Sequence, residues 1–236
     1  MLTTPARQIL ESDTPSERAA AETWRDTDFL GTSKFLMSRA ASMTTQPAIN
    51  PVLIDFPDRI ETRQLLLRVP RAGDGAVVYA SVVETLDDLR RYPASMMWAM
   101  EDQTLDKAEE FCRRGAADWI VRTDLPMLIF RRDNGEHAGN CGLHRFNWMT
   151  GVFEIGWWCR KRYQGQGLIT EAAGAVTEFA FDRLGARRVW CTTDDENARS
   201  WRVAERLGFH HEGTLKGERC DPDGRRRSMR VYATTR

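Results

Sequence analysis

The pattern of apolar and polar positions divides the chain at about residue 55. Before that point Ser, Thr, Ala and charged residues dominate, and apolar residues form only short clusters such as FLGTSKFLM. A segment of this kind cannot bury enough apolar surface to offset the entropy lost on folding. We therefore predict a poorly ordered N-terminal extension over residues 1–55 and a folded domain over residues 56–236, with Met43 as an alternative start of the chain.

The first part of the predicted domain has the pattern of one strand followed by two helices. The apolar run RQLLLRV, residues 63–69, predicts a strand that ends at Pro70. Asp74 is placed to cap the N-terminus of a valine-rich helix. Apolar residues then recur at three- and four-residue spacing over residues 102–115, which predicts a second helix with Gly115 as its end.

Three strands are predicted in quick succession after these helices. Residues 127–133 and 137–146 flank the dipeptide Asn134-Gly135, which favours the tight turn of a β-hairpin. A third apolar stretch, residues 152–160, follows another glycine-containing turn. We predict an antiparallel meander.

The last part of the chain alternates between helices and strands. A long apolar-faced helix should begin after Gly167 and end at Gly185. Beyond it the pattern predicts a strand, a short helix and two more strands, at residues 187–193, 200–208, 210–217 and 226–235. The order β, α, α, β, β, β, α, β, α, β, β predicts the α/β (α+β) class, with a mixed central sheet of about seven strands and helices on both faces.

Charge and composition argue against several classes of protein. The 34 basic and 34 acidic residues balance, which disfavours a general nucleic-acid binder and a polybasic membrane-surface protein. No apolar run approaches the ~18 residues of a membrane-spanning helix, and no signal-peptide core is visible. The five cysteines are widely spaced, and the four histidines lack metal-ligand spacing. We expect reduced thiols, no metal site and a cytoplasmic protein that binds neither nucleic acid nor membrane.

The stretch RYQGQGLITEA places two glycines immediately before the long predicted helix. The first N–H groups of a helix have no intrahelical partner, and the helix dipole adds partial positive charge there. Because Gly165 and Gly167 carry no side chains, a phosphate could approach these amides directly. Thr170 stands where a dinucleotide fingerprint needs its third glycine, and no Gly-Lys-Ser/Thr follows, so neither of those phosphate motifs is present. A tight turn without a ligand is the alternative.

Several motifs together resemble the GCN5-related N-acetyltransferases, the GNAT superfamily. RYQGQG matches the Arg/Gln-x-x-Gly-x-Gly/Ala signature, which in that superfamily holds the pyrophosphate of acetyl-CoA. ENARSWRVAERLGF resembles its Asn-x-x-Ser…Glu-x-Leu-Gly-Phe segment. The likeness runs from about Ile60 to Thr234 and is greatest to the branch of the ribosomal-protein N-terminal acetyltransferases RimJ and RimL.

The resemblance implies a GNAT fold and a set of binding residues. In GNATs two neighbouring strands, the fourth and fifth of the family fold, splay apart, and the strand before the glycine turn pairs with the pantetheine arm. Here that strand is residues 154–159, so Trp158 and Cys159 are implied to make main-chain contacts. The pyrophosphate is implied to lie against Arg162, Gln164, Gly165, Gln166, Gly167 and Leu168. Asn197 is implied to bind the pantetheine, although Asn also suits a helix N-cap.

Two residues are implied to take part in catalysis. Ser200 matches the serine of Asn-x-x-Ser, which lies near the sulfur as a candidate acid, with helix capping as the alternative. Glu154 is an isolated carboxylate in an apolar strand and is the predicted general base, with an exposed strand carboxylate as its alternative and Glu218 as a weaker candidate. Because strand residues alternate, Glu154 should share a face with Trp158 and not with Ile155.

The implied function is transfer of an acetyl group from acetyl-CoA to a primary amine, foremost the N-terminus of a protein or peptide. Direct transfer needs no enzyme nucleophile, and the sequence has no Ser-His-Asp or Cys-His arrangement. Two alternatives stay open: an acetyltransferase for a small amine (polyamine, amino acid or antibiotic), and a non-catalytic acyl-CoA-binding regulatory module. The oligomeric state is also open, although many relatives form homodimers.

The acceptor is the least determined part of this prediction. The RimJ/RimL branch often carries an acidic residue in the last strand after Asp-Gly-Arg, whereas this chain has DGRRRSM there. The arginines at 225–227 would suit an acidic acceptor, but we expect them to form a solvated turn.

Overall fold

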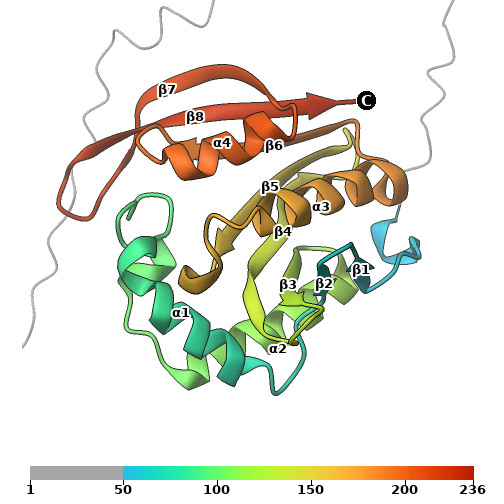
Figure 1. The fold of residues 1–236 in the computed structure, drawn as a ribbon. Coiled ribbons are helices and arrows are strands. Elements are labelled where there is room, and N and C mark those ends of the chain that lie inside the picture. Colours follow the sequence, from blue (N-terminus) through green and yellow to red (C-terminus); the bar gives the residue numbers. More distant parts are fainter. Residues whose placement is uncertain (1–49) are drawn as a thin grey trace, which may run out of the picture. The chain divides into compact units, whose positions relative to one another are not determined.

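A computed structural model describes residues 50–236 (Figure 1). Most of the predicted extension over residues 1–55 therefore lies outside the described residues. In the described part, eight strands and four α-helices follow one another as β1(Arg59–Glu61), β2(Leu65–Arg68), α1(Gly75–Leu89), α2(Leu105–Val121), β3(Leu125–Arg131), β4(His137–Asn147), β5(Val152–Cys159), α3(Leu168–Leu184), β6(Arg188–Asp194), α4(Ala198–Arg206), β7(His210–Cys220) and β8(Arg226–Thr235).

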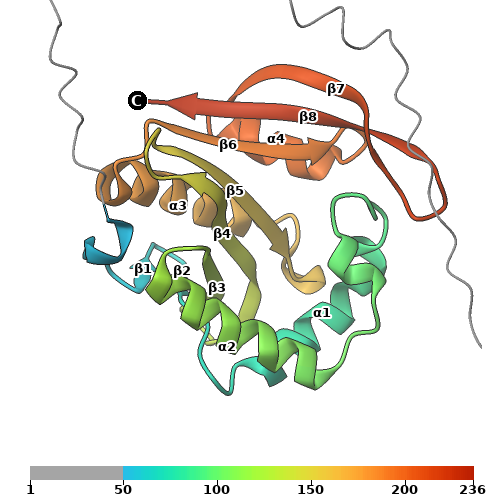
Figure 2. The same cartoon turned by 180° about the vertical axis from the view of Figure 1, so that it is seen from behind.

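The strands form one mixed sheet with helices on both faces, as predicted. Its order is β1-β2-β3-β4-β5-β6-β8-β7, and every neighbouring pair is antiparallel except β5 and β6. Helices α3 and α4 lie on one face, and α1 and α2 cover the other (Figures 1 and 2). The larger apolar core fills the α3 face and includes Phe153 and Ile155, while Trp158 packs on the α1 face. The predicted alternation along β5 is thus confirmed.

The sheet has eight strands where about seven were expected, because a short strand, β1, precedes the first predicted strand and forms a hairpin with it. The N–H of Thr62 donates to the carbonyl of Leu65 at 2.9 Å and closes a tight turn between β1 and β2. The carboxylate of Glu171, in the first turn of α3, accepts hydrogen bonds from the Thr62 hydroxyl and the Gln64 main chain at 2.6 and 2.8 Å. This turn contains no Gly, Pro or Asn, so its own residues do not predict a turn.

Helix α2 continues past Gly115, so the prediction that this glycine ends the helix was wrong. The helix ends instead at Arg122, whose φ of 64° is left-handed. A Cβ at Gly115 would stand 2.9 Å from Cγ of Pro126 and 3.3 Å from Cγ of Pro70. Gly115 therefore permits close packing of α2 on the sheet. Asp74 does precede α1, but its carboxylate bonds to Arg68 and to the Arg71 amide and does not cap the helix.

Strands β5 and β6 pair over a short distance and then separate. Their register covers only Val152–Arg188, Phe153–Val189 and Glu154–Trp190. From residue 155 to residue 159, β5 keeps its partner β4 and has none on the β6 side. This divergence matches the splay of two neighbouring strands that the resemblance implies, displaced by one strand because β1 is additional, and it opens the middle of the sheet.

The loop between α1 and α2 and the β7–β8 hairpin are joined across this opening. The N–H of Ala94 donates to the Asp221 carboxylate at 2.9 Å. Arg219 donates to the Ala94 carbonyl at 3.3 Å and to the Thr192 hydroxyl at 3.1 Å. These bonds link the two halves of the sheet above the point where β5 and β6 part.

A buried ion cluster supports the same hairpin. The side chain of Arg227 is 3% exposed and donates through Nε to Asp194, which is 1% exposed, at 2.8 Å. That hydrogen bond raises the pKa of the Arg227 guanidinium. The Asp221 carboxylate lies 3.7 Å away. The expected solvated turn is therefore wrong for Arg227, which faces inward on β8, and right only for its exposed neighbours.

Replacing Arg227 with Met should destabilise the protein by about 3–5 kcal/mol, because Asp194 and Asp221 would stay buried without a cation. The measurement is the free energy of unfolding in urea. The matched control is Arg226→Met on the same strand, since Arg226 is exposed and should change stability by less than about 0.5 kcal/mol. Equal losses for the two variants would contradict the role of the cluster.

Candidate functional site

The glycine turn leads into α3 with its backbone amides unpaired. Gly165 and Gly167 have left-handed φ values of 75° and 79°, and a Cβ at either position would meet nothing within 4 Å. Among residues 50–236, no acceptor receives a hydrogen bond from the backbone amides of residues 165–170. Glu171 is the first to bond back, to the carbonyl of Gly167 at 3.0 Å. Positive dipole charge and free donors thus coincide at one concave turn.

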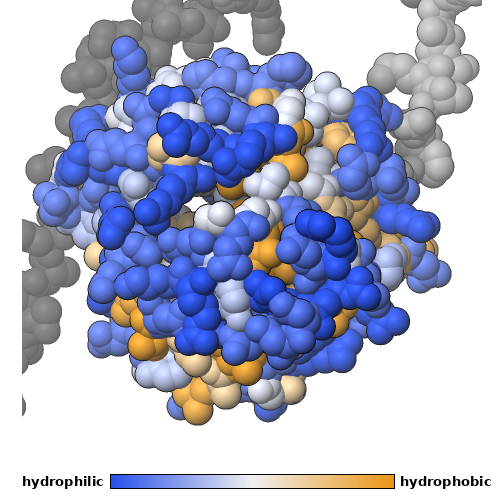
Figure 3. Space-filling view, viewed as in Figure 1, coloured by the Kyte–Doolittle hydropathy of each residue, from blue (hydrophilic) through white to orange (hydrophobic). Residues whose placement is uncertain are grey.

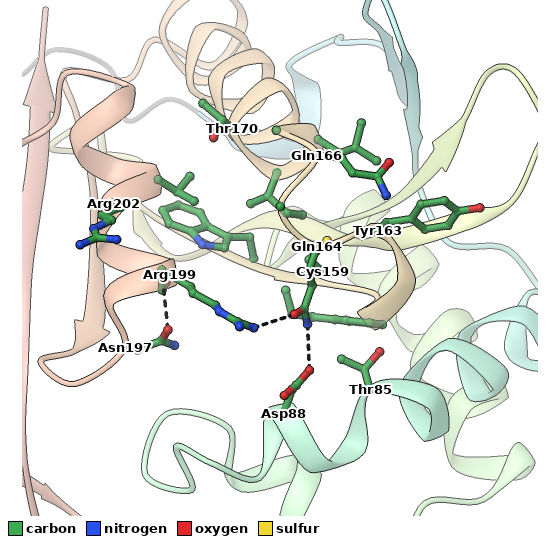
Figure 4. A pocket seen from close by; sticks show the side chains of 18 of the residues that line it. Thr85, Asp88, Cys159, Tyr163, Gln164, Gln166, Thr170, Asn197, Arg199 and Arg202 are labelled. Carbon is green, nitrogen blue, oxygen red and sulfur yellow. Dashed lines mark hydrogen bonds between the residues drawn. The ribbon is translucent and has the colours of Figure 1, made fainter.

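Side chains from three other elements hold this turn in place. Gln164 donates to Asp88 of α1 at 3.2 Å and accepts from Arg199 of α4 at 2.9 Å (Figure 4). Gln166 accepts from Arg131 at 3.1 Å. Both glutamines therefore fix the geometry of the turn as well as border it.

Arg162 is the one predicted binding residue that the structure separates from the others. Its guanidinium pairs with Glu84 at 2.8 Å and with Glu136 at 3.3 Å, and it does not line the cleft. The hydrogen bond that the Arg162 side chain donates to Glu84 raises the pKa of Arg162. The arginine of the motif is committed to neighbouring carboxylates.

The turn opens into a cleft of about 1190 Å³. Figure 3 views the same face, where hydrophilic side chains surround a hollow between α4 and α1. Five arginines line the cleft: Arg63, Arg91, Arg199, Arg202 and Arg206. Three of them recur along α4 at spacings of three and four residues and so share one face of that helix. This basic row was missed at the sequence level, although its helical spacing could have revealed it.

The cleft extends to the place where β5 and β6 part. Trp158 and Cys159 line it from β5, and Asn197 and Ser200 line it from the start of α4. The Asn197 side chain accepts from the Ser200 amide at 3.2 Å, so Asn197 caps α4 and borders the cleft at once. No hydrogen bond from the Ser200 hydroxyl to another of residues 50–236 is present. Burial raises the pKa of the Cys159 thiol to about 12, which keeps it protonated and a poor nucleophile at neutral pH.

A second cleft of about 740 Å³ meets the first at this point. The residues that border both are Ser95, Met96, Trp157, Trp158, Asn197 and Ser200. Ser95 and Met96 belong to the α1–α2 loop and were not predicted as site residues. The second cleft has aromatic walls that include Tyr79, Trp98 and Phe111. Two ligands could therefore approach one junction from different sides.

Glu154 lines the second cleft but is already paired. It is 6% exposed, and both of its carboxylate oxygens accept hydrogen bonds from Arg145, one from Nε at 2.6 Å and the other from Nη2. Arg145 has a left-handed φ of 40° at an irregularity in β4, which turns it toward β5. Glu154 is therefore neither an exposed strand carboxylate nor a carboxylate without an ion-pair partner. Glu218, the weaker candidate, lies on β7 and does not line either cleft.

The described residues hold no gathering of three or more His, Cys, Asp or Glu side chains suited to a metal ion. No helix in residues 50–236 is both long and apolar enough to cross a membrane. All five cysteines lie in this part and are unpaired.

Comparison with known proteins identifies the family. The acetyltransferase (GNAT) domain matches residues 64–210. The N-acetyltransferase YnaD of Bacillus subtilis is 27% identical over 165 residues, 70% of this chain and 89% of YnaD. The ribosomal-protein-serine acetyltransferase of Escherichia coli is 34% identical over 90 residues, 38% of this chain and 49% of that protein.

Solved structures of acetyltransferases have the same fold. RimL, a ribosomal L7/L12 α-N-protein acetyltransferase solved in complex with coenzyme A, superposes with a TM-score of 0.69 at 20% identity, covering 75% of this chain and 97% of RimL. The match over residues 64–210 covers more than half of the chain. The chain therefore belongs to the GNAT acetyltransferase family and is an acetyl-CoA-dependent N-acetyltransferase.

Proposed function

We propose that acetyl-CoA occupies the first cleft and that an N-terminal amine of a protein or peptide enters through the second. The observation that carries this proposal is the run of unpaired amides over residues 165–170 at a helix N-terminus, inside a cleft that meets a second one where the sheet opens. A diphosphate matches those donors and the helix dipole. RimL, with the same fold, has been solved with coenzyme A.

The residues that line the first cleft suit the parts of acetyl-CoA in order. The pyrophosphate lies on the turn formed by residues 164–168, and the basic row on α4 faces the remaining phosphate charge. The pantetheine runs along the open edge of β5, where Trp158 and Cys159 offer main-chain groups. Asn197 borders the same path, and the acetyl group arrives at the junction of the clefts.

The reaction needs an attacking neutral amine, a stabilised oxyanion and a protonated leaving group. The amine nitrogen bonds to the thioester carbon, the C–S bond breaks, and the sulfur leaves as a thiolate. A main-chain N–H on the open edge of β5 is suited to the oxyanion. We assign to Ser200 the protonation of the thiolate, because its hydroxyl borders both clefts and has no partner in residues 50–236.

The predicted base, Glu154, faces the correct cleft but could accept a proton only after its ion pair with Arg145 opens. The 64% exposure of the Arg145 side chain leaves that opening possible. Glu154 therefore stays a candidate base, with its pairing as an obstacle that the sequence did not predict.

The charges of the second cleft favour a peptide over a polyamine. Three carboxylates line it among the described residues, and each pairs with a cation: Glu101 with Lys107, Glu154 with Arg145 and Asp194 with Arg227. A polycation would find no unpaired carboxylate there, whereas the aromatic walls suit a side chain next to a terminal amine. The cytoplasmic location and the homodimer stay predictions.

The substitution Gly167→Ala should weaken acetyl-CoA binding at least about tenfold, or about 1.4 kcal/mol. A Cβ strains the left-handed backbone and redirects the amides. Isothermal titration calorimetry measures the Kd. The matched control is Gly185→Ala at the other end of α3, where φ is 68° and the space is equally open. A Gly167→Ala variant that binds acetyl-CoA like the control would sink the assignment of the turn.

The variant Ser200→Ala should lower kcat by about 10- to 100-fold, because the thiolate would lose its proton donor. The Kd for acetyl-CoA should hardly change, since the Ser200 hydroxyl makes no hydrogen bond within the described part of the chain. Steady-state release of free thiol gives kcat, and calorimetry gives Kd. An unchanged kcat would remove Ser200 from the mechanism.

Labelled acetyl-CoA should acetylate a peptide with a free N-terminal amine and leave spermidine and the N-formylated form of the same peptide unmodified. Mass spectrometry of the products identifies the acetylated nitrogen. Acetylation of spermidine alone would contradict the peptide acceptor. Tight acetyl-CoA binding without thiol release from any amine would instead favour a regulatory module.

A further inference from the structure

We propose that His144, oriented by Asp124, accepts the proton of the attacking amine in the second cleft. This inference rests on the proposed function, because it names the base of the same transfer. It differs from the sequence-based candidate, Glu154, and concerns a histidine that the sequence alone gave no reason to select.

The His144 ring lies in the second cleft, close to where the sheet opens. His144 on β4 is in register with Glu154 on β5, so both side chains project from the same face of the sheet into the second cleft. Two positions along the register, the next pair on this face is Gly142 and Gly156. A Cβ on Gly142 would stand 3.3 Å from Cε1 of the imidazole, and one on Gly156 would stand 3.4 Å from Nε2. Two facing glycines therefore leave room for the ring to lie across the sheet.

A carboxylate fixes the orientation of the ring. Nδ1 of His144 lies 2.6 Å from Oδ1 of Asp124, in the turn that precedes β3. A carboxylate beside Nδ1 favours the tautomer that carries its proton on Nδ1, so the lone pair stays on Nε2. Within residues 50–236, Nε2 has no hydrogen-bond partner. The side chain is 38% exposed, so a ligand in the cleft can reach it.

The other charged groups around the cleft are already paired. Glu154 is held by Arg145 on the same face, and Glu101 is held by Lys107 of α2. Arg219 of β7 donates to the hydroxyl of Thr192 and to a main-chain carbonyl. Asp124 is the carboxylate that contacts His144 itself. Each of the other groups is paired, whereas the lone pair of His144 Nε2 accepts no hydrogen bond from residues 50–236.

The proton balance of the step follows from this geometry. The nitrogen of the neutral amine forms the C–N bond, and the proton it then loses moves to Nε2, which makes His144 an imidazolium beside the Asp124 carboxylate. The C–S bond breaks, and the thiolate of CoA takes a proton from Ser200 or water. The imidazolium returns its proton to solvent through the exposed cleft, and any proton taken from Ser200 is replaced by solvent.

The test is the pH dependence of kcat in the full chain at saturating acetyl-CoA and amine, measured by thiol release with a free-amine peptide or spermidine, whichever the wild type turns over. Saturation is required because kcat/KM also falls at low pH when the free acceptor amine is protonated, whereas kcat reports the groups of the bound complex. Histidines change charge between about pH 5 and 8, and a base must be neutral, so wild-type kcat should fall on the acid side. His144→Gln should lower kcat about 100-fold and remove that acid limb. Asp124→Asn should lower kcat less and move the limb to lower pH, because the imidazolium loses its carboxylate.

Two controls separate this role from a structural one. His211→Gln changes an exposed histidine on β7 that borders neither cleft and should leave the profile unchanged. Calorimetric acetyl-CoA affinity shows whether each variant is folded, and Asp124→Asn keeps the proposal testable if His144→Gln is unstable. An acid limb that stays at the wild-type pH in both His144→Gln and Asp124→Asn, or one that is lost in Glu154→Gln alone, overturns the proposal. A wild type that releases no thiol with any amine refutes the proposed function itself.

Discussion

The divergence of β5 from β6 is the constraint on which the site depends. Three register pairs join the two strands, and beyond Glu154 the sheet lacks a ladder on that side. Buried main-chain N–H and C=O groups require partners. An open strand edge inside the fold is therefore stable only where solvent or an extended ligand can bond to it, and a ligand that does so adds to the sheet as a strand would. In the proposed function, the opening in the sheet is therefore also the path of the substrate.

Such an opening also weakens the sheet, and the surrounding structure compensates. Few bonds would hold β6, β8 and β7 to the rest if only the β5–β6 ladder joined them. The Ala94–Asp221 and Arg219–Ala94 bonds join the two halves on the far side of the gap. The buried Arg227 cluster makes the hairpin that carries these groups rigid. Stability and function therefore draw on the same hairpin, which borders the second cleft through Arg219.

The sequence predicted those features that are encoded locally. Hydrophobic periodicity gave the order of the elements and the alternation along β5, and the glycine turn before α3 was recognised because its donors come from consecutive residues. Features built from distant residues were missed. The β1–β2 turn depends on Glu171, and the inward position of Arg227 depends on Asp194, which lies 33 residues away in the chain. Gly115 was misinterpreted because its reason is contact with two prolines and not a helix end.

The two clefts use opposite electrostatic designs. In the first cleft, the amides of residues 165–170 are unpaired and arginines of α4 line the wall. This arrangement suits a ligand of fixed negative charge, which is the same whatever the acceptor. In the second, the charges at Glu154, Glu101 and Asp194 are neutralised internally. A different acceptor then requires only that one of these ion pairs be broken or that an aromatic side chain of the cleft wall be displaced. In the proposed function, the acceptor is therefore recognised by the walls of the second cleft, to which the α1–α2 loop and Arg219 of β7 contribute, and the nucleotide by the backbone of one turn.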